Sequence, residues 1–426
     1  MKEKKYILSL VVVYLCYFTH GMQAIILQQN KANFFTQWGY TDEVLGAAAV
    51  SLVVTATGFG KLLTVWIGGE ISDKIGRKVM AVAGGVLYVI CFALLYFSTS
   101  FTAACVAGFL MGVATSGFWD ASLYPAVQEA VPKYSGSALV GIKLFVSISG
   151  IIYPLLVVYF ADQGNWKINI LIPLVLSIVC VVVSVIARFA YDDELKTVDK
   201  KSVTDKKKFV DPEVEKAKAR QLVPPNTMVQ IITMAYGFLC MFIMFGAQQY
   251  TKAFGMNSRG LSEMQAAGLT SIYTAGSIVA VIFWAIMMGK LKWNPLKVVL
   301  IDSIFTAVAL VITLLVQNVM VVYVAIALLG FFAAGGALQT GLGVRQLFCP
   351  GPKGRNTGIY YTFMSLASCF LPYIVSAMTK SIGEAAAVNT MMGLLLAAAV
   401  ICILAMSYLV VQHKKMYGVS ALKKAE

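Results

Sequence analysis

The chain has 426 residues, of which 59% are hydrophobic and 13% charged, and its mean hydropathy is +0.78. Water-soluble domains do not reach this mean hydropathy, so the composition excludes a soluble enzyme and places the chain among polytopic membrane proteins. The net charge of +14 would suit nucleic acid as a partner, unless the basic residues serve membrane topology instead.

The apolar runs are long and uninterrupted, which predicts helical spans and not the alternating strands of a barrel. The first run, residues 6–29, is too long for the apolar part of a signal peptide and lacks a small-residue cleavage site, so we expect it to be retained. The hydropathy pattern predicts twelve spans, at residues 6–29, 44–68, 79–98, 101–126, 137–160, 167–189, 227–250, 264–289, 298–316, 320–347, 358–379 and 387–411.

The basic residues lie in alternate loops. Of the 34 Lys and Arg residues, 27 fall on the side that holds both termini. Cytoplasmic loops of membrane proteins carry such an excess, so both termini are predicted to be cytoplasmic. The positive net charge is therefore explained by membrane topology, and no nucleic-acid partner is expected. The partner is the lipid bilayer, and the predicted location is the bacterial inner or plasma membrane, with the chain acting as a monomer.

Two similar halves flank a polar segment. We predict an N-terminal six-helix bundle at 1–190, a cytoplasmic linker at 191–225, a C-terminal bundle at 226–412 and a tail at 413–426. A shift of 218 positions aligns several Gly and Pro residues of the halves: Gly58 with Gly276, Gly112 with Gly330, Gly117 with Gly335 and Pro154 with Pro372. A constant register over four spans indicates two pseudo-symmetric bundles in an all-α membrane protein.

Neither a metal nor another cofactor is expected. The eight cysteines lie within or at the ends of spans, without a CxxC pair or a histidine at metal-ligand spacing, and are predicted to be packing residues. No GxxxxGK[ST] pattern is present, which disfavours ATP-driven transport.

The predicted cytoplasmic loop between spans 2 and 3 reads GEISDKIGRK, residues 69–78. It resembles the signature of the major facilitator superfamily, G-x-x-x-D-[RK]-x-G-[RK]-[RK], at every specified position. The resemblance implies twelve spans in two bundles and transport by alternating access. It also implies that the loop, with a carboxylate at the end of span 4, latches the cytoplasmic gate, through Gly69, Asp73, Lys74, Gly76, Arg77, Lys78 and Glu129.

The residue types in this loop suit such a role. Gly69 and Gly76 are expected to permit close helix approach and a tight turn. Asp73 can lie near a positive helix N-terminus, in this family that of helix 11 near Thr357. Arg77 can pair with Asp73 or with Glu129. The shifted copy at residues 287–297 lacks the aspartate, so the charged latch is expected in the first half alone.

Ionisable residues inside spans are costly and by default face a cavity or a partner. The first half carries His20, Lys61, Asp120 and Lys143 within spans, and the second has Asp302 and Arg345 near cytoplasmic span ends. Asp120 is our candidate for the proton-coupling site, because a desolvated carboxylate binds protons more readily and a neighbouring lysine opposes this. The alternative is that Asp120 pairs with Lys143 or Lys61 only to tie helices together.

Two lysines against one aspartate leave a net positive charge that would suit an anionic cargo. Substrate-binding residues are predicted on this basis and on the family's cavity-lining spans: Lys61, Lys143, His20, Tyr17, Gln23, Tyr124, Gln248, Gln339 and Tyr361. His20 is also a candidate proton site, and the alternative for it is a packed, hydrogen-bonded core histidine.

The leading hypothesis is a proton-coupled transporter that imports a small organic anion, and not an enzyme. The stretches THGMQAIILQQN and YPAVQEAVPKYSGSALVGIK resemble a bacterial subgroup linked to shikimate- or quinate-type acids. A drug/proton antiporter is the alternative, although span 5 has only part of the glycine pattern of such antiporters. A membrane enzyme would need clustered catalytic groups, whereas the two histidines lie at opposite ends of the chain. A non-transporting membrane sensor is a further alternative.

Overall fold

The computed structural model describes residues 3–131, 135–195, 218–351 and 353–422. Within these ranges every regular element is a helix, and twelve helices are long and apolar enough to cross a membrane. The predicted all-α membrane class and the twelve predicted spans are therefore confirmed. Most of the predicted linker (196–217) and the last residues of the predicted tail (423–426) lie outside the described residues.

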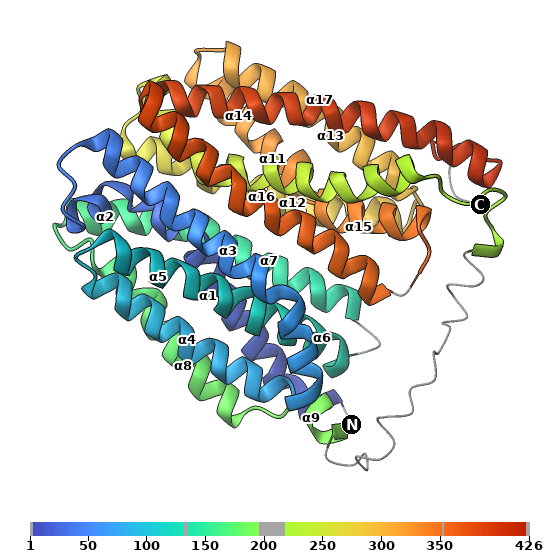
Figure 1. Ribbon diagram of the computed structural model, residues 1–426, viewed down its shortest axis with the longest axis horizontal. Helices are drawn as coiled ribbons and strands as arrows, with labels where there is room; N and C mark the ends of the chain where they lie inside the picture. The colour runs from blue at the N-terminus through green and yellow to red at the C-terminus, as the bar shows by residue number, and fades with distance from the viewer. Residues whose placement is uncertain (1–2, 132–134, 196–217, 352, 423–426) are drawn as a thin grey trace. The chain divides into compact units, whose positions relative to one another are not determined.

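Contacts divide the chain into two units (Figure 1). Unit 1 comprises residues 1–207 with 369–384, and unit 2 comprises residues 208–368 with 385–426. The second half of one helix, Lys353–Ile382, is thus grouped with unit 1. The six-plus-six division at residues 190 and 226 stays a prediction.

The helices of the first half begin and end as follows: α1 (Ile7–Gln29), α2 (Lys31–Gln37), α3 (Glu43–Ile75), α4 (Arg77–Phe97), α5 (Phe101–Gly112), the π-helical segment η2 (Val113–Asp120), α6 (Ala121–Ala130), α7 (Ser135–Asp162), α8 (Ile168–Ile186) and α9 (Ala190–Leu195). Among them α1 packs against α7 and α8, α3 packs against α5, and α4 packs against α8. The continuous helix from α5 to α6 forms the fourth span.

The helices of the second half are α11 (Thr227–Arg259), α12 (Glu263–Gly289), α13 (Pro295–Leu315), α14 (Val319–Leu329), the π-helical segment η4 (Gly330–Ala334), α15 (Ala337–Phe348), α16 (Lys353–Ile382) and α17 (Glu384–Tyr417). In this half α11 packs against α12 and α15, and α12 and α13 both pack against α14.

Short polar side chains fix where several spans begin. Asp42, Ser100, Asn226, Asn294 and Asn318 each accept a hydrogen bond from a backbone N–H of the first turn of the following helix. The first N–H groups of a helix have no intrahelical acceptor, and these caps supply one. These spans therefore start at polar residues next to the apolar runs, which explains why hydropathy located their first residues to within a few positions.

The two halves repeat one another at the level of helix ends. Helix α13 begins and ends 218 positions after α4, and α14 begins 218 positions after α5. A π-helical segment follows both α5 and α14. In these spans the register found in the sequence is also that of the structure.

One aligned pair of the repeat is wrong by two positions. An added Cβ at Gly60 would clash with the carbonyl oxygen of Phe109, and at Gly276 with that of Ala327. Ala327 follows Phe109 by 218 positions, but Gly276 follows Gly60 by only 216. Gly276 therefore corresponds to Gly60 and not to Gly58, because contact with the neighbouring helix, and not sequence spacing, selects the glycine.

A substitution at one of these contacts tests the packing. A Cβ at Gly112 would collide with the backbone carbonyl oxygen of Thr57, which cannot move aside as a flexible side chain could. We expect Gly112→Ala to lower the free energy of unfolding by about 1–3 kcal/mol, the usual effect of overpacking. Gly393→Ala is the control, because nothing lies within 4 Å of a Cβ there, and alanine favours helix over glycine by about 1 kcal/mol. Equal thermal unfolding temperatures of the two purified variants would contradict the prediction.

Candidate functional site

A half-buried carboxylate, that of Asp120, lies at the end of the π-helical segment of the fourth span. The hydroxyl of Tyr17 on α1 donates to Oδ1 of Asp120 at 2.9 Å, and that of Ser116 donates to Oδ2 at 3.0 Å. Tyr17 is 1% exposed. Each carboxylate oxygen therefore has its own donor, so Asp120 is held in one position inside the helix bundle.

The π-helical segment itself is part of this arrangement. It runs from Val113 to Asp120 and also carries Thr115, Ser116 and Trp119. Such single-turn widenings of an α-helix are rare and often mark functional sites. Here the widened turn carries several buried polar side chains at the contact with α3 and α4.

Lys61 is an electrostatic partner of Asp120. It lies half-buried on α3 and interacts with the charge of Asp120, and its charge also acts on His20. No N–O distance of 4 Å or less joins Lys61 to Asp120 in the described residues, so the two groups interact across a longer separation. Lys143 lies half-buried on α7.

A second polar cluster lies beside the first. The Tyr88 hydroxyl is 3.0 Å from Nδ1 of His20 and 2.6 Å from the Thr115 hydroxyl, and it donates to Oε1 of Gln23 at 3.2 Å. The Tyr88 ring stacks on Trp119 with 4.3 Å between ring centroids. His20 and Gln23 are thus joined through two residues that the sequence analysis did not select. A tyrosine or threonine in an apolar span has no neighbouring pattern that would reveal such a contact.

The other predicted cargo residues are spread over several helices. Tyr124 on α6 meets Tyr17 edge to face, with ring centroids 5.2 Å apart. In unit 2, Gln248 is half-buried on α11, Gln339 is exposed on α15, and Tyr361 is half-buried on α16. The structure therefore brings together Tyr17, His20, Gln23, Lys61, Asp120 and Tyr124 around the contact of α1 with the fourth span.

The charged loop between α3 and α4 is built around Arg77. Its guanidinium donates to Oδ1 of Asp73 at 2.8 Å, to Oε1 of Glu129 at 2.9 Å and to the Ser72 hydroxyl at 2.6 Å. The Arg77 side chain is only 6% exposed. Arg77 therefore binds both of the carboxylates that the sequence analysis offered as alternative partners. Gly76, with φ of +97°, makes the tight turn that precedes α4.

Helix α9 completes this loop, and sequence reasoning missed it. The Asp192 carboxylate accepts from the backbone N–H groups of Arg77 and Lys78 at 3.0 and 3.2 Å, which caps the N-terminus of α4. The Arg77 guanidinium lies 4.2 Å from the centre of the Tyr191 ring. Asp192 was assigned only to the polar linker, because no local pattern relates it to a loop more than a hundred residues earlier.

Gly68 and helix α9 also determine how this loop packs. An added Cβ at Gly69 would meet nothing within 4 Å, whereas at Gly68 it would clash with the carbonyl oxygen of Gly117. The close helix approach expected at Gly69 is therefore made by Gly68, which faces the π-helical segment. Helix α9 is also tied to the N-terminus, since Lys5 pairs with Asp193 at 2.6 Å. This hydrogen bond raises the pKa of Lys5.

The profile of the Major Facilitator Superfamily matches residues 9–372. The chain belongs to this family. The transporter YfkL of Bacillus subtilis (strain 168), described as an uncharacterised MFS-type transporter, is 30% identical, and the match covers 96% of this chain and 97% of YfkL. YdiN of Escherichia coli (strain K12), an inner membrane transport protein, is 28% identical over 88% of this chain and 84% of its own length.

A solved structure gives the same fold. The crystal structure of a D-xylose-proton symporter matches this MFS chain with a TM-score of 0.70 at 14% identity, over 93% of this chain and 97% of the other. The predicted major facilitator fold is confirmed. The protein is thus a multi-pass membrane transporter of the MFS, and its family implies a small-molecule substrate.

Proposed function

We propose that this MFS transporter couples the movement of a small organic anion to protons. The observation that carries the proposal is the half-buried pair of opposite charges in unit 1, Asp120 and Lys61, with Asp120 held by Tyr17 and Ser116. Ionisable groups inside spans mark substrate paths and proton relays in membrane proteins. A carboxylate and an ammonium that interact inside the bundle supply a group that can take up a proton and a group that can attract an anion.

The two groups suggest an order of events. While Asp120 is ionised, its charge offsets that of Lys61. When Asp120 takes up a proton, the positive charge of Lys61 is no longer offset, and a carboxylate of the cargo can replace Asp120 as its partner. The neutral polar groups Gln23, Tyr124, Gln248, Gln339 and Tyr361 suit the hydroxyls of the cargo, and Lys143 and His20 are further cargo ligands, with His20 as a second candidate proton site. Loss of the proton restores the Asp120–Lys61 interaction and releases the anion.

For the cargo we propose a cyclic carboxylate of the shikimate or quinate type, imported across the bacterial inner or plasma membrane by a monomer with cytoplasmic termini. The motif cluster of Asp73, Arg77 and Glu129 is proposed as the latch of the cytoplasmic gate, with Gly69, Lys74, Gly76 and Lys78 as the remaining members of the motif. Ion pairs at helix ends suit a latch, because they can form in one state and break in another.

A binding screen tests the cargo class. A ligand that binds only the folded protein stabilises it by about 2.7 kcal/mol at a hundred times its dissociation constant. We therefore expect shikimate or quinate to raise the thermal unfolding temperature of the purified protein, more strongly at the lower of two pH values. Neutral cyclic polyols serve as the matched control for ring shape. Stabilisation by lipophilic amines alone would overturn the proposal in favour of drug export.

A further inference from the structure

Unit 2 contains a buried carboxylate of its own. Asp302 on α13 is 1% exposed. Among the described residues, neither of its oxygens has a hydrogen-bond partner of ordinary length and angle, and the indole N–H of Trp284 on α12 has none either. The contact between the Trp284 indole N–H and the Asp302 carboxylate is therefore at most a long, weak hydrogen bond. Buried polar groups almost always have a partner, so an exception calls for an explanation.

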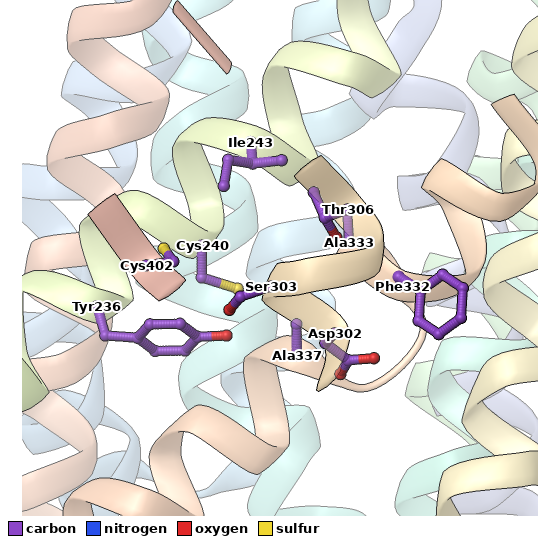
Figure 2. A pocket seen from close by; sticks show the side chains of 10 residues that line it. All are labelled: Tyr236, Cys240, Ile243, Asp302, Ser303, Thr306, Phe332, Ala333, Ala337 and Cys402. Carbon is purple, nitrogen blue, oxygen red and sulfur yellow. The ribbon is translucent and has the colours of Figure 1, made fainter. Parts of the chain in front are cut away.

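Asp302 lines a small cavity between helices of the C-terminal half. Figure 2 shows this cavity with the hydroxyl groups of Tyr236 and Ser303 and the thiol of Cys240 among its lining groups. Its volume is about 20 Å³. A buried water needs roughly 10–15 Å³, whereas sites for organic ligands measure about 300 Å³ or more. The cavity can therefore hold one water molecule but no cargo.

Among the described residues, no positively charged side chain lines the cavity of Asp302. The titratable groups that line the cavity with it are Tyr236 and Cys240 from α11 and Cys402 from α17, and none of the described lining residues is Lys, Arg or His. The buried Arg345 of α15 donates to the carbonyl oxygen of Gln230 at 3.2 Å and to the Thr233 hydroxyl at 2.9 Å.

The surroundings make an ionised Asp302 costly. On one side lies the apolar cluster of Ala280, Trp284 and Val298, against which Phe331 and Phe332 pack. Transferring an isolated carboxylate into such surroundings costs so much free energy that the group takes up a proton instead. A protonated carboxyl group can donate one hydrogen bond and accept others, and a water molecule in the cavity would satisfy it.

A comparison with the first half explains why there is room for this cavity in unit 2. The equivalents of Asp302, Ala337 and Thr306, 218 positions earlier, are Gly84, Trp119 and Tyr88. In unit 1 an added Cβ at Gly84 would lie 2.5 Å from the Trp119 ring, and that ring stacks on Tyr88. An aspartate would not fit there. In unit 2 the two large side chains are replaced by alanine and threonine, which leaves room for a carboxyl group and the cavity.

We propose that Asp302 is a proton-binding site of unit 2, which holds one proton and one water molecule in this cavity. The proton comes from bulk water and neutralises the carboxylate, with no other bond made or broken. A metal cation fits less well, because Asp302 is the only carboxylate among the residues that line the cavity and the other lining groups are neutral hydroxyls, thiols and carbon. The proposal depends neither on the proposed cargo nor on Asp120.

Infrared spectroscopy of the full-length protein in lipid tests the assignment. A protonated carboxyl group absorbs at a higher carbonyl frequency than an ionised one, so the two forms are distinguished directly. Near neutral pH we expect a protonated-carboxyl band in the wild type that is absent in Asp302→Asn and retained in Asp120→Asn. Asparagine matches a neutral aspartic acid in size and charge, so the thermal unfolding temperature of Asp302→Asn should stay close to that of the wild type.

Two further measurements decide the remaining outcomes. If Asp302→Asn does not fold, Thr306→Val serves instead, because it removes a cavity hydroxyl and should shift the acid band without abolishing it. A wild-type spectrum without any acid band that responds to either variant overturns the proposal. An acid band that appears only when sodium is replaced by choline also overturns it, since Asp302 would then bind a metal cation.

Discussion

Asp120→Asn is expected to reduce proton-driven cargo accumulation in proteoliposomes to the level of empty liposomes. Asparagine has nearly the shape of a protonated aspartate and can still accept from Tyr17 at 2.9 Å and from Ser116 at 3.0 Å through its carbonyl oxygen and small rearrangements. It cannot release a proton. The variant is therefore fixed in the state that binds cargo, and a proton gradient can no longer drive its cycle.

Exchange of labelled for unlabelled cargo should survive in the same variant, because exchange needs no net movement of protons. This contrast separates a lost coupling site from a protein that fails to fold. Asp162→Asn provides the matched control, since Asp162 is an exposed carboxylate at the end of α7 in the same unit. Full gradient-driven uptake by Asp120→Asn would remove Asp120 as the coupling site, and loss of both uptake and exchange would assign it a structural role.

Local patterns were sufficient for the membrane spans and for part of the charged loop. A span must be apolar over about 20 residues because lipid cannot hydrogen-bond its backbone, so hydropathy located all twelve. Arg77 and Glu129 were recognised as partners because the motif and the end of span 4 lie on the same predicted face. Asp192 and Tyr191 were missed, although they touch Arg77, because their position depends on how α9 folds back.

The candidate site was predictable only as a set of residue types. Charge alone selected Asp120, Lys61, Lys143 and His20, but which of them interact depends on helix rotation and packing. The structure adds the link from His20 through Tyr88 to Gln23, and Tyr88 is one of 20 tyrosines in the chain. The wrong pairing of Gly276 with Gly58 also arose because sequence does not show packing. A two-residue change of register changes the helix contacts but leaves the hydropathy pattern unchanged.

The second large effect is expected at Arg77. Arg77→Gln should lower the free energy of unfolding by about 2 kcal/mol or more, since breaking a buried ion pair leaves an uncompensated charge. The value lies below the usual range for fully buried pairs, because the Asp73 side chain is 66% exposed and solvent screens it. Without the guanidinium, Glu129 would lie near Asp73 and Asp192 with no cation between them. Thermal or denaturant unfolding of the purified protein measures the change.

A double-mutant cycle with Glu129→Gln separates the ion pair from the other contacts of Arg77. Glu129 is 25% exposed and receives two donors from the guanidinium, so we expect a coupling free energy of about 1–3 kcal/mol, the range for residues in one ion-pair network. Lys74→Gln, an exposed lysine of the same loop, should leave stability nearly unchanged. Additive effects of the two substitutions would instead mean that the Ser72 and Tyr191 contacts hold the loop, because those contacts do not require Glu129. In that case the Arg77–Glu129 pair would add no stabilisation of its own. The proposed latch would then depend on the Asp73–Arg77 pair alone.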